Sequence, residues 1–425
     1  MDQQVFVYVD LDSTPHLVGR LWLHVRKRVE SATFRYDEAW LRNPVRFALE
    51  PALQMDTAPH HTAAGKSQFG AIGDSAPDRW GRALMMRAES RRARLAGEPP
   101  RTLWEADYLL LVDDETRQGA LRFAAQEGGS FLREAVDHRT PPLIELPALL
   151  AASEHVYDEV ESEDELRLLL APGSSLGGAR PKASVRDRNG QLAIAKFPHH
   201  HDRIQTVLWE AVAFRLAAKA GIRTATARIE NVAGRPVFLL SRFDREGSAR
   251  RPFLSAMSML GAADHETRSY LEIADALQQH GASPTEDLHE LWRRIVFSVL
   301  ISNTDDHLRN HGFLYEGSQG WRLSPAYDLN PVPVEFRPRI LSTLIDEQSG
   351  EASLDLALSV AEYFRLSPPE ARQIARKVAQ VVGRWRQEAA ALKIPAAEID
   401  LVSSAFEHVE MAKAKALRTE IIRSK

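Results

Sequence analysis

One segment of the chain, residues 301–314 with the sequence ISNTDDHLRNHGFL, holds carboxylate, imidazole and amide side chains between apolar ends. Three kinds of structure gather such side chains: a metal site, the catalytic loop of a phosphoryl-transfer enzyme, and a hydrogen-bonded turn between buried elements. Taken by itself the segment fits a turn best, because Asp and Asn side chains bond readily to nearby backbone groups. Its spacing and its surroundings therefore decide between the three.

The spacing within this segment is that of a protein-kinase catalytic loop. Asp305 and Asn310 are five residues apart, like the catalytic aspartate and the metal-binding asparagine of the kinase motif HRDxxxxN. Asp328 follows a predicted strand pair, where kinases place the aspartate of DFG. Phosphoryl transfer needs one carboxylate at the incoming hydroxyl, and an amide and a second carboxylate that hold Mg²⁺ against the phosphates. The pattern therefore favours a kinase-like catalytic loop.

Residues upstream fit the nucleotide half of a kinase. Residues 172–182, PGSSLGGARPK, form a glycine-rich segment whose backbone N–H groups could cradle phosphate, and Lys196 follows in a strand, like the lysine of VAIK. Glu210 comes fourteen residues later in an apolar helix, where kinases keep the glutamate that pairs with this lysine. Each feature alone is common in a flexible turn, at a strand edge or on a helix surface. Their common order along the chain favours a nucleotide site.

The elements that must position these residues are predicted from hydropathy patterns. Apolar residues alternate in the N-terminal part, which predicts a small antiparallel sheet, and the helix that carries Glu210 has Gly221 placed for a left-handed cap. A helix with a capping box of Ser283, Pro284 and Glu286 precedes the catalytic segment. The predicted strands are 5–10, 17–25, 32–37, 183–185, 191–197 and 236–244, and the predicted helices are 80–97, two within 141–172, 202–220 and most of 260–425, with a hairpin at 312–330.

Composition excludes several classes of protein. The 425 residues contain no cysteine, which excludes disulfides, thiolate zinc sites and a catalytic thiol. No run approaches the roughly 20 apolar residues that span a bilayer. With 54 basic and 58 acidic residues the net charge is −4, which gives no general attraction to nucleic acid. We therefore expect a cytoplasmic protein of two or three domains or lobes. One basic cluster is interpreted as the solvated face of a helix: Arg87, Arg91, Arg92 and Arg94.

Several motifs together resemble the HipA-like serine/threonine kinases of bacterial toxin–antitoxin systems. They are GSSLGGARPKAS (173–184), LAIAKFP (192–198), LLSRFDR (239–245), SNTDDHLRNHGF (302–313), LSPAYDL (323–329) and FGAIGDSAPDRWGRALM (69–85). The resemblance covers most of the chain and implies an α+β, two-lobed protein-kinase-like fold with a small β-rich N-terminal subdomain and an all-helical C-lobe. The implied domains are an N-terminal α+β subdomain at 1–140, the rest of the N-lobe at 141–245, and the C-lobe at 246–425.

The resemblance also implies roles in the catalytic segment. ATP and Mg²⁺ would be the cofactors, with Asp305 as the catalytic base and Asn310 and Asp328 as metal ligands. His307 would buttress the loop or lie near the phosphates. A serine or threonine hydroxyl of a protein would be the acceptor of the phosphoryl group.

The nucleotide half receives implied roles in the same way. Lys196 would contact the α- and β-phosphates and pair with Glu210, and the backbone from Ser241 to Phe243 would hold the adenine edge. Ser175, next to Ser174, would be autophosphorylated, which places negative charge beside the nucleotide and switches the kinase off. The flexible phosphate loop would consist of Gly177, Gly178, Ala179, Arg180 and Lys182.

The implied partners are ATP, a protein target such as an aminoacyl-tRNA synthetase or another translation component, and a small DNA-binding antitoxin (HipB-like). Contact with nucleic acid is expected only through that partner, and contact with a membrane is not expected. Two alternatives remain. A kinase of a small molecule would use every residue named above. The other is an inactive kinase-fold scaffold that partners a DNA-binding protein, and the retention of Lys196, Asp305, Asn310 and Asp328 argues against it.

Three departures from ordinary kinases matter. Asn303 and Thr304 replace the His-Arg of HRD, and Asp328-Leu329-Asn330 replaces DFG, so the activation-loop logic of ordinary kinases does not carry over. The run FPHHHD (197–202) suggests a metal site, but three adjacent histidines cannot all face one ion on a strand. We interpret this run as an exposed approach to the following helix.

Overall fold

The computed structural model describes residues 2–134, 140–173, 178, 180–264 and 266–418. The chain forms two compact units. The first unit contains Met1–His201 and Glu230–Ala263, and the second contains Asp202–Ile229 and Asp264–Lys425. The chain thus passes between the units three times, after His201, Ile229 and Ala263.

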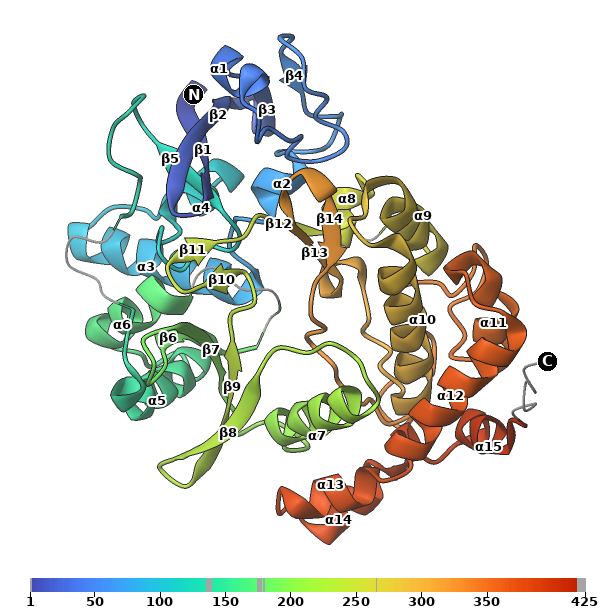
Figure 1. Ribbon diagram of the computed structural model, residues 1–425. Coiled ribbons are helices and arrows are strands. Elements are labelled where there is room, and N and C mark those ends of the chain that lie inside the picture. Colours follow the sequence, from blue (N-terminus) through green and yellow to red (C-terminus); the bar gives the residue numbers. More distant parts are fainter. Residues whose placement is uncertain (1, 135–139, 174–177, 179, 265, 419–425) are drawn as a thin grey trace. The chain divides into compact units, whose positions relative to one another are not determined.

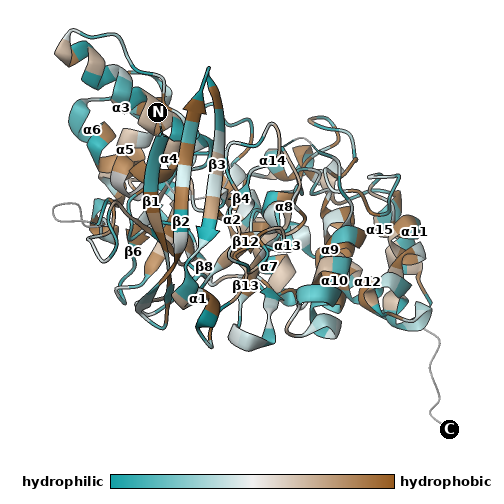
Figure 2. Cartoon of the chain, turned by 90° about the horizontal axis from the view of Figure 1, so that it is seen from above, coloured by the Kyte–Doolittle hydropathy of each residue, from teal (hydrophilic) through white to brown (hydrophobic). Residues whose placement is uncertain are grey.

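The first unit begins with a five-stranded antiparallel sheet in the order β4-β3-β2-β1-β5. Hydrophobic and hydrophilic residues are mixed along the three long strands (Figure 2). Buried positions alternate in β3 at Ala32, Phe34 and Tyr36, as predicted, whereas β1 has four consecutive buried residues from Val7 to Asp10. Asp12 and Ser13 join the first two strands with φ angles of 50° and 63°, as a two-residue hairpin turn requires. The strands are β1 (Asp2–Leu11), β2 (Thr14–Arg26), β3 (Val29–Tyr36), β4 (His60–His61) and β5 (Leu121–Ala124).

A second sheet, most of which belongs to the first unit, carries the predicted nucleotide residues Lys182, Lys196 and Ser241. Its strand order is β6-β7-β9-β8, with β6 (Lys182–Arg186), β7 (Leu192–Lys196), β8 (Ala227–Val232) and β9 (Arg235–Ser241). The helices α3 (Arg79–Ala96), α5 (Leu146–Tyr157) and α6 (Glu163–Gly173) share a core with this sheet. That core includes Trp80, Leu84, Leu149, Leu169, Val185, Ala195, Phe197 and Leu239.

The described residues of the second unit form mainly helices, with one hairpin and a segment of irregular structure at 324–353. At the centre of this unit lies α10 (Pro284–Ile301), which packs against α9 (Tyr270–His280), α11 (Leu354–Ser359) and α12 (Pro368–Val382) (Figure 1). The predicted hairpin is formed by β13 (Gly312–Tyr315) and β14 (Trp321–Leu323). The other helices of this unit are α7 (Thr206–Lys219), α13 (Trp385–Ala391), α14 (Ala396–Leu401) and α15 (Val409–Ala416).

The remaining elements are short. They are α1 (Glu38–Arg42), α2 (Gly70–Gly73), α4 (Glu105–Leu111), β10 (Arg245–Glu246), β11 (Ala249–Arg250), β12 (Phe253–Ser255), α8 (Ala256–Met259) and five 3₁₀ turns at Leu143–Glu145, Leu308–Asn310, Gly317–Gln319, Ala361–Phe364 and Ser403–Ala405. Nowhere in the described part of the chain does a helix combine the length and the apolar character that crossing a membrane requires.

Two helix ends test the predicted caps. The left-handed cap of α7 is confirmed, because Gly221 has a φ of 84° and the N–H of Ile222 donates to the carbonyl of Ala217. The prediction of a capping box at the start of α10 is wrong. Pro284 does occupy the first turn, but the Ser283 side chain makes no capping bond and the Glu286 carboxylate instead accepts from Arg322 at 2.9 Å.

The basic cluster on α3 is occupied by internal contacts. Arg87 pairs with Glu159 and Glu161, Arg91 donates to the Glu161 carbonyl, and Arg92 pairs with Glu89. These arginines thus hold the segment that follows α5 and the end of their own helix, which is a structural use of the charges.

Candidate active site

The predicted catalytic segment leaves α10 through a sharp turn. Ser302 caps the helix in the left-handed region with a φ of 52°. Beyond it, exposed and buried side chains alternate: Asp305, His307 and Arg309 are exposed, whereas Asp306, Leu308 and Asn310 are buried. This alternation presents Asp305 to solvent and fixes the loop to the protein through its neighbours.

Asn310 and Asp305 are joined through the backbone. The Asn310 side-chain nitrogen donates to the Asp305 carbonyl at 3.0 Å, and the His307 N–H donates to the same carbonyl at 2.9 Å. The bond from the amide nitrogen directs the amide oxygen of Asn310 away from that carbonyl. An oxygen held in this way is a suitable ligand for a hard cation such as Mg²⁺.

Among the described residues, the Asp305 carboxylate pairs with Arg337, whose Nη1 lies 2.8 Å from Oδ1. The Asp305 side chain is 61% exposed and that of Arg337 is 45% exposed. Exposed ion pairs of this kind contribute only about 0–1 kcal/mol. Asp305 can therefore leave Arg337 for an incoming hydroxyl at low cost.

Asp306, the neighbour of Asp305, is the buried anchor of the segment. Its carboxylate accepts hydrogen bonds from the Tyr270 hydroxyl and from Ser298 Oγ, and it lies 3.0 Å from His311 Nε2. Burial opposes the charged form of Asp306, but His311 and the two hydroxyl donors outweigh burial and hold its pKa below the usual value. Thr343 also donates to the Asp306 carbonyl at 2.7 Å.

Asp328 belongs to a segment that is bonded to the catalytic segment. The Asn303 side-chain oxygen accepts from the Asn330 N–H at 3.2 Å, and the Tyr327 hydroxyl donates to the Arg309 carbonyl at 2.7 Å. Asp328 itself has a φ of 53°, an uncommon conformation that Asp tolerates better than most residues. The structure therefore brings the segments of Asp305, Asn310 and Asp328 together within the second unit.

Asn303 and Asp306 are functional candidates that the sequence reasoning missed. Asn303 is buried and bridges α10 to the segment after Asp328, since its nitrogen lies 3.4 Å from Ser298 Oγ. The replacement of His-Arg by Asn303 and Thr304 was the available signal. It marks a loop that is held by an asparagine rather than by the histidine and arginine of ordinary kinases.

In the first unit, Lys182 differs from its predicted place. It is not part of a flexible phosphate loop: it is the first residue of β6, and its ammonium lies 2.8 Å from the Asp78 carboxylate. The two side chains are only 4% and 6% exposed. Asp78 also caps α3 by accepting from the Gly81 N–H at 2.7 Å, and Trp80 donates to the Lys182 carbonyl at 2.9 Å. Lys182 thus ties β6 to α3.

The other residues of the predicted phosphate loop are only partly described. Gly178 has a φ of 107°, which glycine adopts without strain, and Arg180 is exposed. Gly177, Ala179 and the two serines proposed for autophosphorylation, Ser174 and Ser175, lie outside the described residues.

Lys196 ends β7 at the half-buried face of the second sheet, where it pairs in register with Phe238 of β9. Glu210 is 4% exposed on α7 and belongs to the second unit. A glutamate without a function on a helix surface would be solvated, so the burial of Glu210 favours a role. Its predicted ion pair with Lys196 stays a prediction.

The segment from Ser241 to Phe243 continues the edge of β9. The Arg242 N–H donates to the Leu192 carbonyl at 3.1 Å, so an adenine edge would have to use the backbone groups of the flanking residues. Asp244 follows, fully buried, and accepts from the Gly119 N–H at 2.8 Å. Burial opposes its charged form, but the guanidinium groups of Arg242 and Arg245 hold the pKa of Asp244 well below its usual range.

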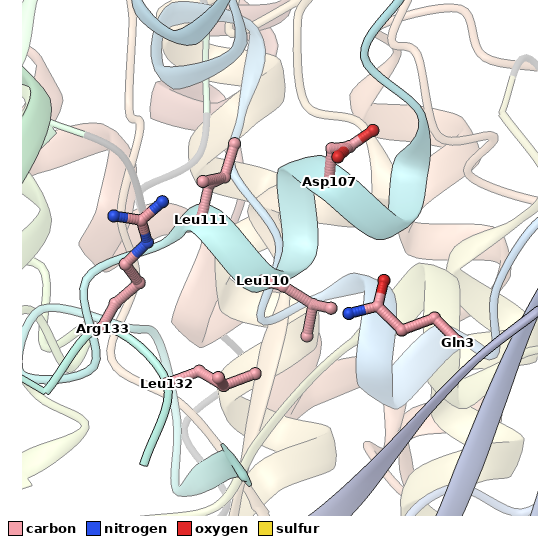
Figure 3. Close-up of a pocket in the computed structure, with 6 residues that line it drawn as sticks. All are labelled: Gln3, Asp107, Leu110, Leu111, Leu132 and Arg133. Carbon is pink, nitrogen blue, oxygen red and sulfur yellow. The ribbon is translucent and has the colours of Figure 1, made fainter. Parts of the chain in front are cut away.

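A small cavity of about 250 Å³ lies elsewhere in the first unit, below the range of about 300–1,000 Å³ that is typical of ligand pockets. Figure 3 shows its leucine side chains beside one carboxylate and one guanidinium group. It shares no residue with the predicted site. Its lining consists of Gln3, Asp107, Leu110, Leu111, Leu132 and Arg133.

Comparison of the sequence with known proteins gives three findings. Residues 174–385, about half of the chain, match the family model of the HipA-like C-terminal domain. A protein of Haemophilus influenzae named "Putative kinase" is 30% identical over 131 residues, which are 28% of this chain and 38% of that protein. "Putative kinase Y4mE" of Sinorhizobium fredii is 26% identical over 181 residues, which are 36% of this chain and 41% of that protein. The matches thus span about two fifths of the length of these relatives.

The fold of nearly the whole chain matches that of a solved structure. The HipA, HipB and operator DNA complex of a Shewanella oneidensis MR-1 toxin–antitoxin system contains a chain that matches with a TM-score of 0.63 at 17% identity. The match covers 97% of this chain and 96% of that one. The two-lobed, kinase-like α+β fold predicted from the sequence is thereby confirmed.

Proposed function

Because the chain carries a HipA-like C-terminal domain at residues 174–385, we propose that it is an ATP- and Mg²⁺-dependent kinase that phosphorylates a serine or threonine of a protein. The observation that carries this proposal is the arrangement of the second unit, where hydrogen bonds join the segments of Asp305, Asn310 and Asp328. One exposed carboxylate and two oxygen ligands are the set that phosphoryl transfer requires.

In the proposed reaction the substrate hydroxyl gives its proton to Asp305. At the same time the oxygen of this hydroxyl forms a bond to the γ-phosphorus of ATP. The bond between that phosphorus and the bridging oxygen breaks, and ADP leaves. Asn310 and Asp328 would hold Mg²⁺, whose charge neutralises the β- and γ-phosphates. Lys196 would contact the α- and β-phosphates. Asp306 takes no part in the transfer and keeps the backbone of Asp305 in place.

The proposed regulation and partners rest on the family resemblance. Phosphorylation of Ser175 by the enzyme itself would add about −1.5 to −2 charges at the phosphate loop and disfavour ATP. The solved Shewanella oneidensis relative is described together with HipB and operator DNA. By analogy we propose a small DNA-binding antitoxin as partner of this chain, and a translation component such as an aminoacyl-tRNA synthetase as target. The net charge of −4 agrees with contact to DNA through such a partner.

The test is incubation of purified protein with γ-labelled ATP and Mg²⁺, followed by mapping of the label. Asp305→Asn and Asp328→Ala should both lose transfer. Asp400→Asn is a matched control, because Asp400 is also an exposed aspartate paired with an arginine at 2.8 Å. Label in the 170–185 peptide or in a protein substrate supports the proposal. Label found only in small molecules would contradict the protein-kinase proposal and indicate a kinase of a small molecule. Absence of ATP binding would indicate an inactive scaffold.

A further inference from the structure

The histidine run at 199–201 lies on a turn after β7, not on a strand. His199 is buried, its ring lies against Tyr157, and its Nδ1 accepts from the His201 N–H at 3.1 Å. His200 and His201 are exposed. One histidine thus shapes the turn while the other two face solvent, so the alternation of side chains along a strand does not apply to them.

Asp158 completes a cluster with these two histidines. It is the C-cap residue of α5, and one ligand atom from each of Asp158, His200 and His201 lies within 4.8 Å of the other two. His200 Nε2 lies 3.3 Å from Asp158 Oδ1. Ligand atoms around a tetrahedral Zn²⁺ are roughly 3.3 Å apart, since the bonds are about 2.0–2.1 Å. Exposed side chains reach that spacing by small rotations. We infer that Asp158, His200 and His201 form a Zn²⁺ site.

The surroundings of the cluster suit a bound cation. Glu154 lies one helical turn before Asp158, and its Oε1 is 3.8 Å from His200 Nδ1. This distance is longer than a hydrogen bond. If Glu154 moves into hydrogen-bond range of Nδ1, it gives the usual support of a metal-bound histidine and leaves Nε2 for the metal. Glu154 is in turn paired with Arg235. The C-terminal end of α5 adds its partial negative charge at the same place.

The ligand set selects the kind of metal. Two imidazoles and one carboxylate favour Zn²⁺ over Mg²⁺, which prefers oxygen ligands. Three protein ligands leave a position for water. The site would link the end of α5 to the turn at which the chain leaves the first unit, since His201 is the last residue of that unit before Asp202.

The chain contains a matched control for this inference. His60 and His61 are also adjacent, and His60 Nε2 also lies 3.3 Å from an aspartate, Asp56. These two histidines form strand β4, where successive side chains point to opposite faces. His61 Nδ1 is bonded to Thr33 instead. The residue types are therefore the same as at 200–201, but the two imidazoles and the carboxylate do not face a common point.

The experiment is a calorimetric titration of tag-free, chelator-treated protein with Zn²⁺. We expect one Zn²⁺ per chain in the wild type and in His60→Ala/His61→Ala, and loss of binding in His200→Ala/His201→Ala. Asp158→Asn should weaken binding, and Glu154→Gln should weaken it by about 10–100-fold, as is typical of supporting carboxylates. Circular dichroism without metal shows whether each variant is folded, and His201→Gln replaces the double variant if that one is not.

A second readout is the melting temperature, which Zn²⁺ should raise in the wild type and leave unchanged in the variant without His200 and His201. The inference is overturned if the wild type binds no Zn²⁺, or if loss of the two histidines leaves stoichiometry and affinity unchanged. Equal loss in both double variants would also overturn it, because binding would then follow histidine content rather than geometry. None of these readouts depends on kinase activity.

Discussion

Lys182 and Lys196 lie directly opposite each other on the antiparallel strands β6 and β7. Side chains at opposed positions share a face of the sheet, with Cβ atoms about 4.5–5.5 Å apart, and like charges at such positions repel. Asp78 offsets this repulsion, since its carboxylate lies 2.8 Å from the Lys182 ammonium. The lysine proposed to meet phosphate therefore has a neighbour whose charge is already balanced.

Replacement of Asp78 by Asn tests this arrangement. The amide can still cap α3, because Asn is as good an N-cap as Asp, but the negative charge beside buried Lys182 is lost. Breaking a buried ion pair costs about 3–5 kcal/mol, so we expect a loss of that order in the free energy of unfolding. Urea denaturation measures it.

The matched variant is Asp78→Asn combined with Lys182→Met, which removes both charges and should recover most of the loss. A change below about 1 kcal/mol in the single variant would show that the pair contributes little, as exposed pairs do.

Asp305→Asn should lower the rate of phosphoryl transfer by about 10²–10⁴, the usual contribution of a general base. Stability should be almost unchanged, because the side chain is exposed and its pair with Arg337 is weak. Single-turnover kinetics with saturating ATP measure the rate, and calorimetry measures ATP affinity. Near-normal turnover by the variant would remove Asp305 from the mechanism.

Arg337 and Arg339 provide a contrast between an exposed and an anchoring arginine. Arg337→Ala should change the free energy of unfolding by less than about 1 kcal/mol. Arg339 donates to Ser302 Oγ at 3.0 Å and to the Val299 carbonyl at 2.8 Å, and bonds from a charged group contribute about 1.5–3 kcal/mol each. Thermal and urea unfolding should therefore show a much lower free energy of unfolding for Arg339→Ala than for Arg337→Ala. Equal losses would contradict the proposed difference.

Glu50 predicts a pH dependence of stability. Burial raises the pKa of this carboxyl to about 7, although it accepts the Ala71 N–H. The folded state therefore keeps the proton at pH values where the unfolded state has released it. Stability is greatest below the unfolded pKa of about 4.5 and falls as the pH rises toward 7, by roughly 3 kcal/mol in total.

The measurement is urea unfolding of the wild type and Glu50→Gln from pH 4.5 to pH 8. The difference between the two should change across this range and level off above the folded pKa. A constant difference would show that Glu50 does not titrate in this range.

The parts of the fold that rest on local patterns could be predicted from the sequence. Alternating apolar residues identified the three long strands of the N-terminal sheet, and Gly221 identified the end of α7. Strands β4 and β5 have only two and four residues, too few to show a period. The capping box failed because Arg322, on a later strand, binds the Glu286 carboxylate in competition with the helix end.

In the candidate site, too, the features that depend on neighbouring residues could be predicted, and those that depend on distant residues could not. The roles of Asp305, Asn310 and Asp328 were predicted from their spacing and order along the chain. The burial of Lys182 depends on Asp78, more than a hundred residues earlier, and the anchoring of Asp306 depends in part on Tyr270, 36 residues earlier. Such long-range pairs leave no periodic signal in one sequence.

The two adjacent aspartates of the catalytic segment have an evolutionary consequence. Asp306 holds the loop through buried partners, whereas Asp305 contributes almost nothing to folding. A descendant of this protein could therefore exchange Asp305, lose the proposed phosphoryl transfer in one step, and still inherit an intact fold. If the proposed role of Asp305 is correct, the passage from a kinase to an inert descendant requires no compensating change elsewhere in the chain.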